Sequence, residues 1–307
     1  MIGQILGRLA EAVIALLLMS LVVFLLSRVT GDPVALLLGD AATAEDKAAM
    51  IAELRLDRSL TQQYLSFLGN AVQGDFGQSV TAGRQDALEL ALSRIPASLS
   101  LAGVALGFTL AIGIVLGVIA AVTRGTAIDV FVRLVALLGQ SVPSFWLGIV
   151  LIYLFAVNWG VLPTSGFGGW TYYVLPATTL GLFTLSAVTR LVRASMLDAL
   201  GSDYVKLARI KGISEASVLI RHALANSLIP VVTFMGTFFA TMITGAVVVE
   251  TVFAWPGIGR LAFESILARD FPVIQTVVLV ITAFFILANF LVDMLYLAID
   301  PRMRGRG

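Results

Sequence analysis

Few residues in this chain of 307 could perform covalent or metal chemistry. The sequence has no cysteine, and its single histidine, His222, cannot build a two-histidine zinc site. It also lacks the GxxxxGK[ST] pattern that cradles nucleotide phosphates and the GxSxG and HExxH patterns of hydrolases. We therefore predict no catalytic, metal or cofactor-binding residue, and we expect that the chain is not an enzyme.

The densest group of charged residues lies between residues 190 and 230. Six Lys or Arg stand there against three Asp or Glu, so the positive-inside rule predicts a cytoplasmic segment. Its pattern predicts two short helices that meet at Gly212 and form a compact knob beneath the bilayer. An ordinary basic loop that binds lipid headgroups is the alternative. The first helix is expected to align Tyr204, Leu207, Ala208, Lys211 and Gly212 on one face, and the second to align Val218, Leu219 and His222.

The composition places these charges in a membrane protein. Hydrophobic residues make up 59% of the chain and charged residues 13%, and the mean hydropathy is +0.97. The net charge of +1 is spread over several loops, so no nucleic-acid partner is expected. We predict an all-α integral membrane protein with a first transmembrane helix (1–29), an external segment with an amphipathic helix (30–97) and a five-helix core that includes the 190–230 loop (98–307).

Six apolar runs are long enough to cross a hydrocarbon core about 30 Å thick. They predict spans at residues 9–27, 99–122, 130–157, 173–189, 228–249 and 273–299. Twelve Lys or Arg then fall on the side of the termini, against two in the shorter opposite loops. This bias predicts that both termini are cytoplasmic and that the long acidic segment is external.

Two patterns predict how helices pack. In the external segment, Ser59 or Thr61 is expected to cap an amphipathic helix that lies on the membrane surface or against the outer mouth of the bundle. Its apolar face would hold Tyr64, Phe67, Leu68, Ala71 and Val72. The second span has small residues at helical spacing, which predict close approach of a neighbouring helix. These residues are Gly103, Gly107, Gly113 and Gly117.

Polar residues in three places could line a translocation pathway. Gln140 and Ser141 precede Pro143, which is expected to kink the third span; a packing kink with Gln140 bonded to another helix is the alternative. Glu250 could meet substrate or cap backbone donors. A hydroxyl stripe on the fifth span fits pore lining or bonding to the helix's own carbonyls. The stripe consists of Thr233, Thr237, Thr241 and Thr244.

Ionisable residues inside the spans bear on a different function, that of an ion-coupled secondary transporter acting alone. Glu11 and Asp293 are its candidates, and both lie near the cytoplasmic edge. For Asn289 and Asp293 a helix-to-helix hydrogen bond is the preferred interpretation. No GxSxG, HExxH or paired mid-span aspartates support an intramembrane enzyme.

Several passages resemble the dipeptide/oligopeptide/nickel branch of ABC import permeases. They are Gly31-Asp32-Pro33, Gly74-Asp75-Phe76-Gly77-x-Ser79, Ser144-Phe145-Trp146-Leu147-Gly148, residues 204–212, residues 250–261, Arg269-Asp270-Phe271-Pro272 and Asp300-Pro301-Arg302. The broader family pattern in the loop has Glu-Ala-Ala and, after three residues, Gly. Here Lys206 and Leu207 replace the first two residues, whereas Ala208 and Gly212 match.

The resemblance implies a permease subunit of an ATP-driven, binding-protein-dependent importer in the bacterial inner membrane. Its cargo would be di- or oligopeptides; nickel chelates, glutathione-like compounds and glycosides share the scaffold. The implied partners are a homologous second permease that completes the pathway, two ATP-binding subunits that hold ATP and Mg, an extracytoplasmic substrate-binding protein, and membrane lipid. The implied ATPase-coupling residues are Tyr204, Lys206, Leu207, Ala208, Arg209, Lys211, Gly212 and His222.

Overall fold

The computed structural model describes residues 2–29, 38, 43–53 and 57–299. Within these ranges the side chains at 2–6, at 53, and at several positions of 233–244 and 292–299 are not described. The Gly31-Asp32-Pro33 and Asp300-Pro301-Arg302 passages, the side chains of the threonine stripe and the side chain of Asp293 therefore lie outside the described residues.

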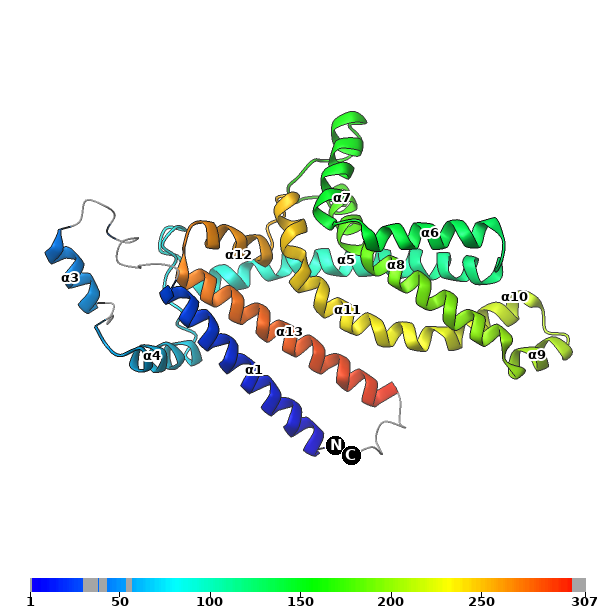
Figure 1. The fold of residues 1–307 in the computed structure, drawn as a ribbon, viewed down its shortest axis with the longest axis horizontal. Helices are drawn as coiled ribbons and strands as arrows, with labels where there is room; N and C mark the ends of the chain where they lie inside the picture. Colours follow the sequence, from blue (N-terminus) through cyan, green and yellow to red (C-terminus); the bar gives the residue numbers. More distant parts are fainter. Residues whose placement is uncertain (1, 30–37, 39–42, 54–56, 300–307) are drawn as a thin grey trace. The chain divides into compact units, whose positions relative to one another are not determined.

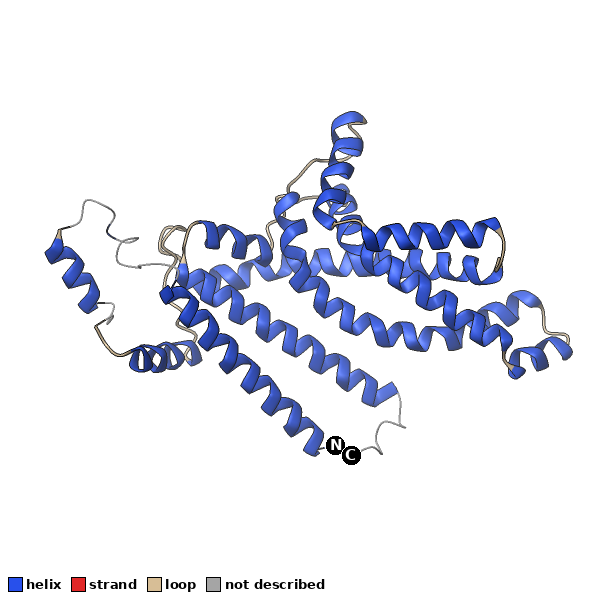
Figure 2. Cartoon of the chain, in the orientation of Figure 1, coloured by secondary structure: helices blue, strands red, loops and turns tan. Residues whose placement is uncertain are grey.

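The described part of the chain consists of helices joined by turns (Figures 1 and 2), which confirms the all-α prediction. One isolated antiparallel bridge joins Gln78 and Asp86. The helices are α1 (Ile2–Val29), α3 (Ala44–Glu53), α4 (Leu60–Val72), α5 (Ala87–Val122), α6 (Ala127–Ser141), α7 (Ser144–Leu151), the π-helical η1 (Ile152–Asn158), α8 (Thr171–Gly201), α9 (Asp203–Ile210), α10 (Glu215–Ser217), the π-helical η2 (Val218–Leu224), α11 (Ala225–Val252), α12 (Ile258–Leu267) and α13 (Phe271–Ile299).

The number of spans differs from the expected six. In the described residues, four helices are long and apolar enough to cross a membrane, within α1, α5, α8 and α13. A fifth is added if α6 and the α7–η1 helix are counted together as one span. The described helices thus support a multi-pass membrane protein, and the count of six is not confirmed.

The third predicted span is broken rather than kinked. Helix α6 ends at Ser141, α7 begins at Ser144, and the two are bent by 108°. Val142 and Pro143 between them are both extended, with ψ of 124° and 135°. The residue before a proline is pushed out of the helical region, and the proline has no amide to continue the ladder. The prediction of one kinked helix was therefore wrong.

The chain folds into two compact units. The first comprises Met1–Ser98, Pro256–Phe290 and Leu297–Gly307. Its core is formed by one face each of α5, α12 and α13, with Ala87, Ala91, Ile258, Leu261, Val273 and Val277 buried. Apolar burial of this kind is the main force that holds three amphipathic faces together.

In the same unit, the amphipathic helix α4 packs against α1. Ser59 caps α4 by accepting a bond from the Gln62 amide. The ring of Phe24 on α1 lies 5.4 Å from Tyr64 and 5.9 Å from Phe67, and the Tyr64 hydroxyl is 2.9 Å from Ser20 Oγ. The predicted helix and one of its two predicted caps are confirmed.

The second unit comprises Leu99–Trp255 and Leu291–Tyr296, and α8 is its central helix. Gly113 and Gly117 of α5 lie against Val188 and Val192 of α8, where a Cβ on either glycine would press on a valine side chain. A Cβ on Gly103 or on the nearby Gly107 would meet nothing within 4 Å. Among the described residues, only the second half of the glycine pattern is therefore used for packing.

Candidate functional site

The predicted knob is a compact helical turn-back formed by residues 202–224. Val205 and Ala208 of α9 are buried against Val218 of η2. The opposite face of α9 is exposed and partly apolar: Tyr204, Leu207 and Ile210 are 43%, 51% and 82% exposed. We had expected Ala208 on the same face as Tyr204, Leu207, Lys211 and Gly212. It lies instead on the buried face of α9, together with Val205.

Gly212 closes helix α9 in a left-handed conformation. Its φ is +75°, its amide bonds to the Arg209 carbonyl at 3.0 Å, and the amide of Ile213 reaches back to the Ala208 carbonyl at 3.2 Å. This is the Schellman arrangement, which favours glycine because other residues are strained at positive φ. A Cβ at this position would meet nothing within 4 Å, so the requirement for glycine lies in the backbone.

Two of the basic side chains predicted to couple to the ATPase, those of Arg209 and Lys206, form ion pairs within the knob. Arg209 binds Glu215 through two N–H groups, Nε–H to Oε2 at 3.1 Å and Nη2–H to Oε1. The Arg209 guanidinium lowers the pKa of the Glu215 carboxyl. The ion pair is therefore fully formed above the ordinary pKa of a glutamate and is lost when the pH falls through the lowered pKa. Lys206 pairs with Asp203 at 2.9 Å. Lys211 has no ion-pair partner in the described part of the chain.

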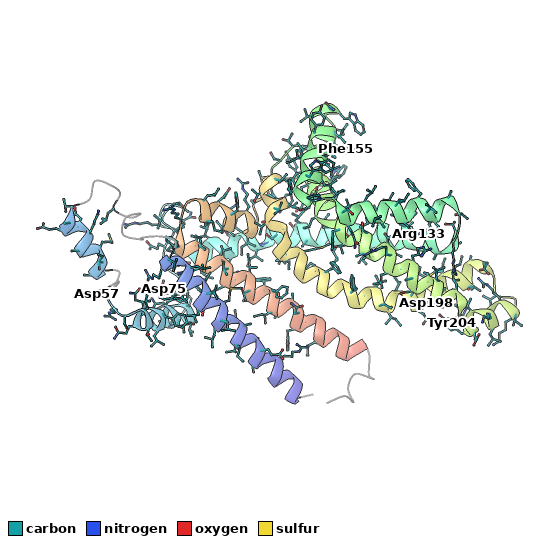
Figure 3. All side chains as sticks on the ribbon, viewed as in Figure 1. Asp57, Asp75, Arg133, Phe155, Asp198 and Tyr204 are labelled. Atoms are coloured by element: carbon teal, nitrogen blue, oxygen red, sulfur yellow. The ribbon has the colours of Figure 1, made fainter. Side chains whose placement is uncertain are left out.

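The knob is connected to two long helices. Ser202 separates α9 from α8, and η2 continues without a break into α11 at Ala225. Val218 of η2 is buried, whereas Leu219 and His222 are half-buried. Figure 3 shows Tyr204 on α9 near Asp198 on the last turns of α8. A force on the knob would therefore reach α8 and α11 directly.

An ion pair that the sequence analysis did not single out joins α6 to α8. Asp129 is 1% exposed and accepts bonds from Arg193 Nε at 2.7 Å and Nη2 at 2.9 Å. The Gly125 amide and Arg133 Nε also lie 3.1 and 3.3 Å from its carboxylate. Arg193 had been counted as a loop charge. The available signal was the only carboxylate of a mostly apolar helix, in its first turn.

A second contact that was missed brings together two of the passages that carry the family resemblance. The buried Asp270 carboxylate accepts bonds from Ser79 Oγ at 2.6 Å, from the Thr81 amide at 3.1 Å and from Thr81 Oγ1 at 2.8 Å. In the first passage, Asp75 Oδ1 accepts the Gly77 amide. The turn motif around residue 79 is thus anchored to the start of α13.

At the Trp255 turn, two aromatic rings pack against a buried tryptophan. Trp255 is fully buried, with ring centroids 4.9 Å from Phe167 and 4.6 Å from Tyr173, both edge-on. Ala254 has a φ of +49°, and the Trp255 amide bonds to the Glu250 carbonyl at 2.8 Å. These contacts fix the chain where α11 ends.

The structure describes the side chains of only three of the predicted pathway residues, namely Gln140, Ser141 and Glu250. Ser141 is exposed and its hydroxyl bonds to the Leu137 carbonyl at 3.0 Å, while Gln140 is half-buried. The Glu250 side chain is fully buried. The four threonines of α11 have side chains outside the described residues. Pathway lining by these residues stays a prediction.

Glu11 and Asn289, whose side chains the structure describes, lie in ordinary local contacts. Glu11 pairs with Arg8 at 3.1 Å on the surface. Asn289 donates to the Phe285 carbonyl of its own helix at 2.8 Å, so the helix-to-helix bond expected for it is not seen. No group of three or more His, Asp or Glu that could hold a metal ion is found among the described residues.

Comparison with known proteins gives consistent matches along the whole chain. Residues 113–305 match the family described as binding-protein-dependent transport system inner membrane component, and residues 1–102 match its N-terminal companion. The glutathione transport system permease protein GsiC of Escherichia coli K12 is 41% identical over 305 residues, covering 99% of both chains, and GsiC of Shigella dysenteriae matches equally.

Solved structures show the same fold. An inward-facing MetNI methionine ABC transporter aligns with a TM-score of 0.58 at 19% identity, over 69% of this chain and 96% of that one. An amino acid ABC transporter crystallised with histidines aligns with a TM-score of 0.54 at 15% identity, over 67% and 92%.

Proposed function

Because this chain belongs to the family of binding-protein-dependent transport system inner membrane components, we propose that its 202–224 knob is where an ATP-hydrolysing partner transmits force to it. The chain is the permease of a binding-protein-dependent ABC importer, a multi-pass inner-membrane translocation component rather than an enzyme.

The observation that carries the proposal is the division of α9 into two faces. Its inner face is packed against Val218, whereas Tyr204, Leu207 and Ile210 are presented outward beside charged side chains. An exposed apolar stripe on a polar segment is typical of a surface that another protein covers. Since η2 continues into α11, movement of this stripe would displace the whole helix.

The number and orientation of the membrane spans are part of the proposal. We propose six spans, with α11 as the one added to the apolar helices above, because it is 28 residues long and residues 225–249 carry no charged side chain. Both termini and the knob would face the cytoplasm under the positive-inside rule. A homologous second permease would complete the pathway, with two ATP-binding subunits below and a substrate-binding protein outside.

For the cargo we propose short peptides. The relatives that match over the whole chain are described as glutathione transport permeases, and glutathione is a small peptide. The described residues offer no charged cluster that would hold a metal ion as cargo. Equilibrium binding of dipeptides, oligopeptides and glutathione to the partner binding protein would identify the class, since that protein delivers the substrate.

The docking surface is tested by introducing a charge on it. Leu207→Asp should abolish co-purification of the ATP-binding subunits and ATP-driven uptake, because a carboxylate on an apolar contact must be desolvated. Leu267→Asp is the matched control: Leu267 is 70% exposed on α12, away from the knob in sequence and in the other unit. If both variants retain the ATP-binding subunits equally, the knob is not the docking surface.

A further inference from the structure

A pocket of about 410 Å³ opens between α6 and α8. Its walls are formed by Val130, Arg133, Leu134, Leu137, Arg190 and Arg193. Figure 3 places Arg133 on α6. Arg193 stands eight residues before Gly201, where α8 ends, so the pocket lies roughly 12 Å along the helix from the knob. The pocket belongs entirely to the second unit.

The pocket carries excess positive charge. Asp129 beneath it is saturated by the two N–H bonds from Arg193, and Arg133 lies close to the same carboxylate. Three arginines therefore line the pocket, and the one carboxylate beside it is already bonded to two of them. Arg190 is exposed and has no hydrogen-bond or ion-pair partner among the described residues. Arg190 can therefore accept an anion without first breaking an internal pair.

The remaining walls are apolar and continue along α6. Val130, Leu134 and Leu137 are 43%, 53% and 55% exposed, and Phe131 and Leu138 extend the same exposed apolar surface. A water-soluble anion would gain nothing from these walls. A ligand with a phosphate at one end and a hydrocarbon chain at the other would contact both parts of the pocket.

We propose that this pocket binds an anionic phospholipid of the cytoplasmic leaflet, with the phosphate on Arg190 and Arg133 and an acyl chain along Leu134 and Leu137. The location in that leaflet rests on the topology proposed above. The lipid would bridge α6 and α8 at the same level as the Asp129–Arg193 pair. The lipid would thereby stabilise α8, the helix that leads into the knob.

The affinity of the assembled transporter for phosphatidylglycerol tests the proposal. Titration into detergent-solubilised complex should show saturable binding, and phosphatidylcholine should bind more weakly. Arg190→Gln should weaken phosphatidylglycerol binding about fivefold, the effect of one basic residue near an anionic lipid. Arg124→Gln, an exposed arginine that does not line the pocket, is the control and should change little.

Two further arms separate other occupants. Inorganic phosphate that competes with phosphatidylglycerol at millimolar concentration would mean that a free anion is the ligand. The chain has no cysteine, so Arg190→Cys adds its only thiol. Phosphatidylglycerol should slow maleimide labelling of this thiol; if assembly with the second permease protects it regardless of lipid, the pocket is a protein interface.

Failure of the lipid proposal can be told apart from failure of the transport proposal. The Leu207→Asp permease should bind phosphatidylglycerol with unchanged affinity even after it has lost the ATP-binding subunits, because Leu207 does not line the pocket. Unchanged lipid affinity in Arg190→Gln, or equal binding of phosphatidylcholine, would overturn the lipid site and leave the knob assignment standing.

Discussion

Ser79 and Asp270, 191 residues apart in sequence, are joined by a buried hydrogen bond of 2.6 Å from Ser79 Oγ to the Asp270 carboxylate. Ser79 Oγ also accepts the Ala82 amide at 2.8 Å, so one hydroxyl shapes the turn and attaches it to the start of α13. The first unit is thus closed by polar contacts as well as by its apolar core.

Ser79→Ala should lower the free energy of unfolding by about 2 kcal/mol, because hydrogen bonds to a charged group contribute about 1.5–3 kcal/mol. Denaturant titration in detergent micelles measures the change. Ser93→Ala is the control, since Ser93 Oγ bonds only to the Leu90 carbonyl of its own helix. Equal stability of the two variants would show that the attachment contributes nothing.

The Asp129–Arg193 pair should couple α6 to α8. Arg193→Gln removes the two-bond partner of a carboxylate that is shielded from solvent, so Tm should fall further than in the surface variant Arg124→Gln. Asp129→Asn combined with Arg193→Gln should recover part of the loss, because no buried charge is left unpaired; Arg133, the other partner of Asp129, is 50% exposed. A double-mutant cycle with no coupling energy would argue against a functional link between the two side chains.

Substitutions of Gly212 change the backbone conformation of the knob without changing its exposed apolar side chains. A non-glycine residue in the left-handed region costs about 1–2 kcal/mol, and asparagine tolerates it better than valine. Gly212→Val should lose ATP-driven uptake while remaining membrane-inserted, and Gly212→Asn should retain most of it. Since a Cβ has open space here, equal activity of both variants would mean that the turn is not required for coupling.

Trp255 is expected to dominate the stability of the turn after α11. Trp255→Ala should cost about 3–5 kcal/mol, as for other fully buried tryptophans, and Trp255→Phe should cost less because it keeps a ring between Phe167 and Tyr173. Trp170→Ala, at a 76% exposed site, serves as the control for unfolding followed by near-ultraviolet circular dichroism. A loss no larger than in that control would contradict the packing argument.

The features that depend on local pattern were predictable from the sequence. The apolar runs identified four helices that can span a membrane, and Ser59 with the apolar face of α4 identified the amphipathic helix. The reversal of the chain at Gly212 followed from glycine at the end of a helical pattern. In each case neighbouring residues alone determine the conformation.

Features that depend on contacts between distant residues were not predictable. Nothing near Ser79 indicates that its partner is Asp270, and nothing near Arg193 indicates Asp129. The pattern around Pro143 fits a kink as well as a 108° break, because the choice depends on what packs on either side. Periodicity likewise grouped Ala208 with Tyr204 and Leu207, since it allows several faces, whereas the packing of Val205 and Ala208 against Val218 selects the buried one.

Solute accumulation in proteoliposomes is the most direct test of the account, in which this permease is a passive gate worked through its knob. The complete assembly of both permeases, ATP-binding subunits and binding protein should accumulate a bound peptide only with ATP, and the same subunits reconstituted with the Leu207→Asp permease should accumulate none. Uptake against a gradient by this chain alone, without a nucleotide-hydrolysing partner, would contradict the account.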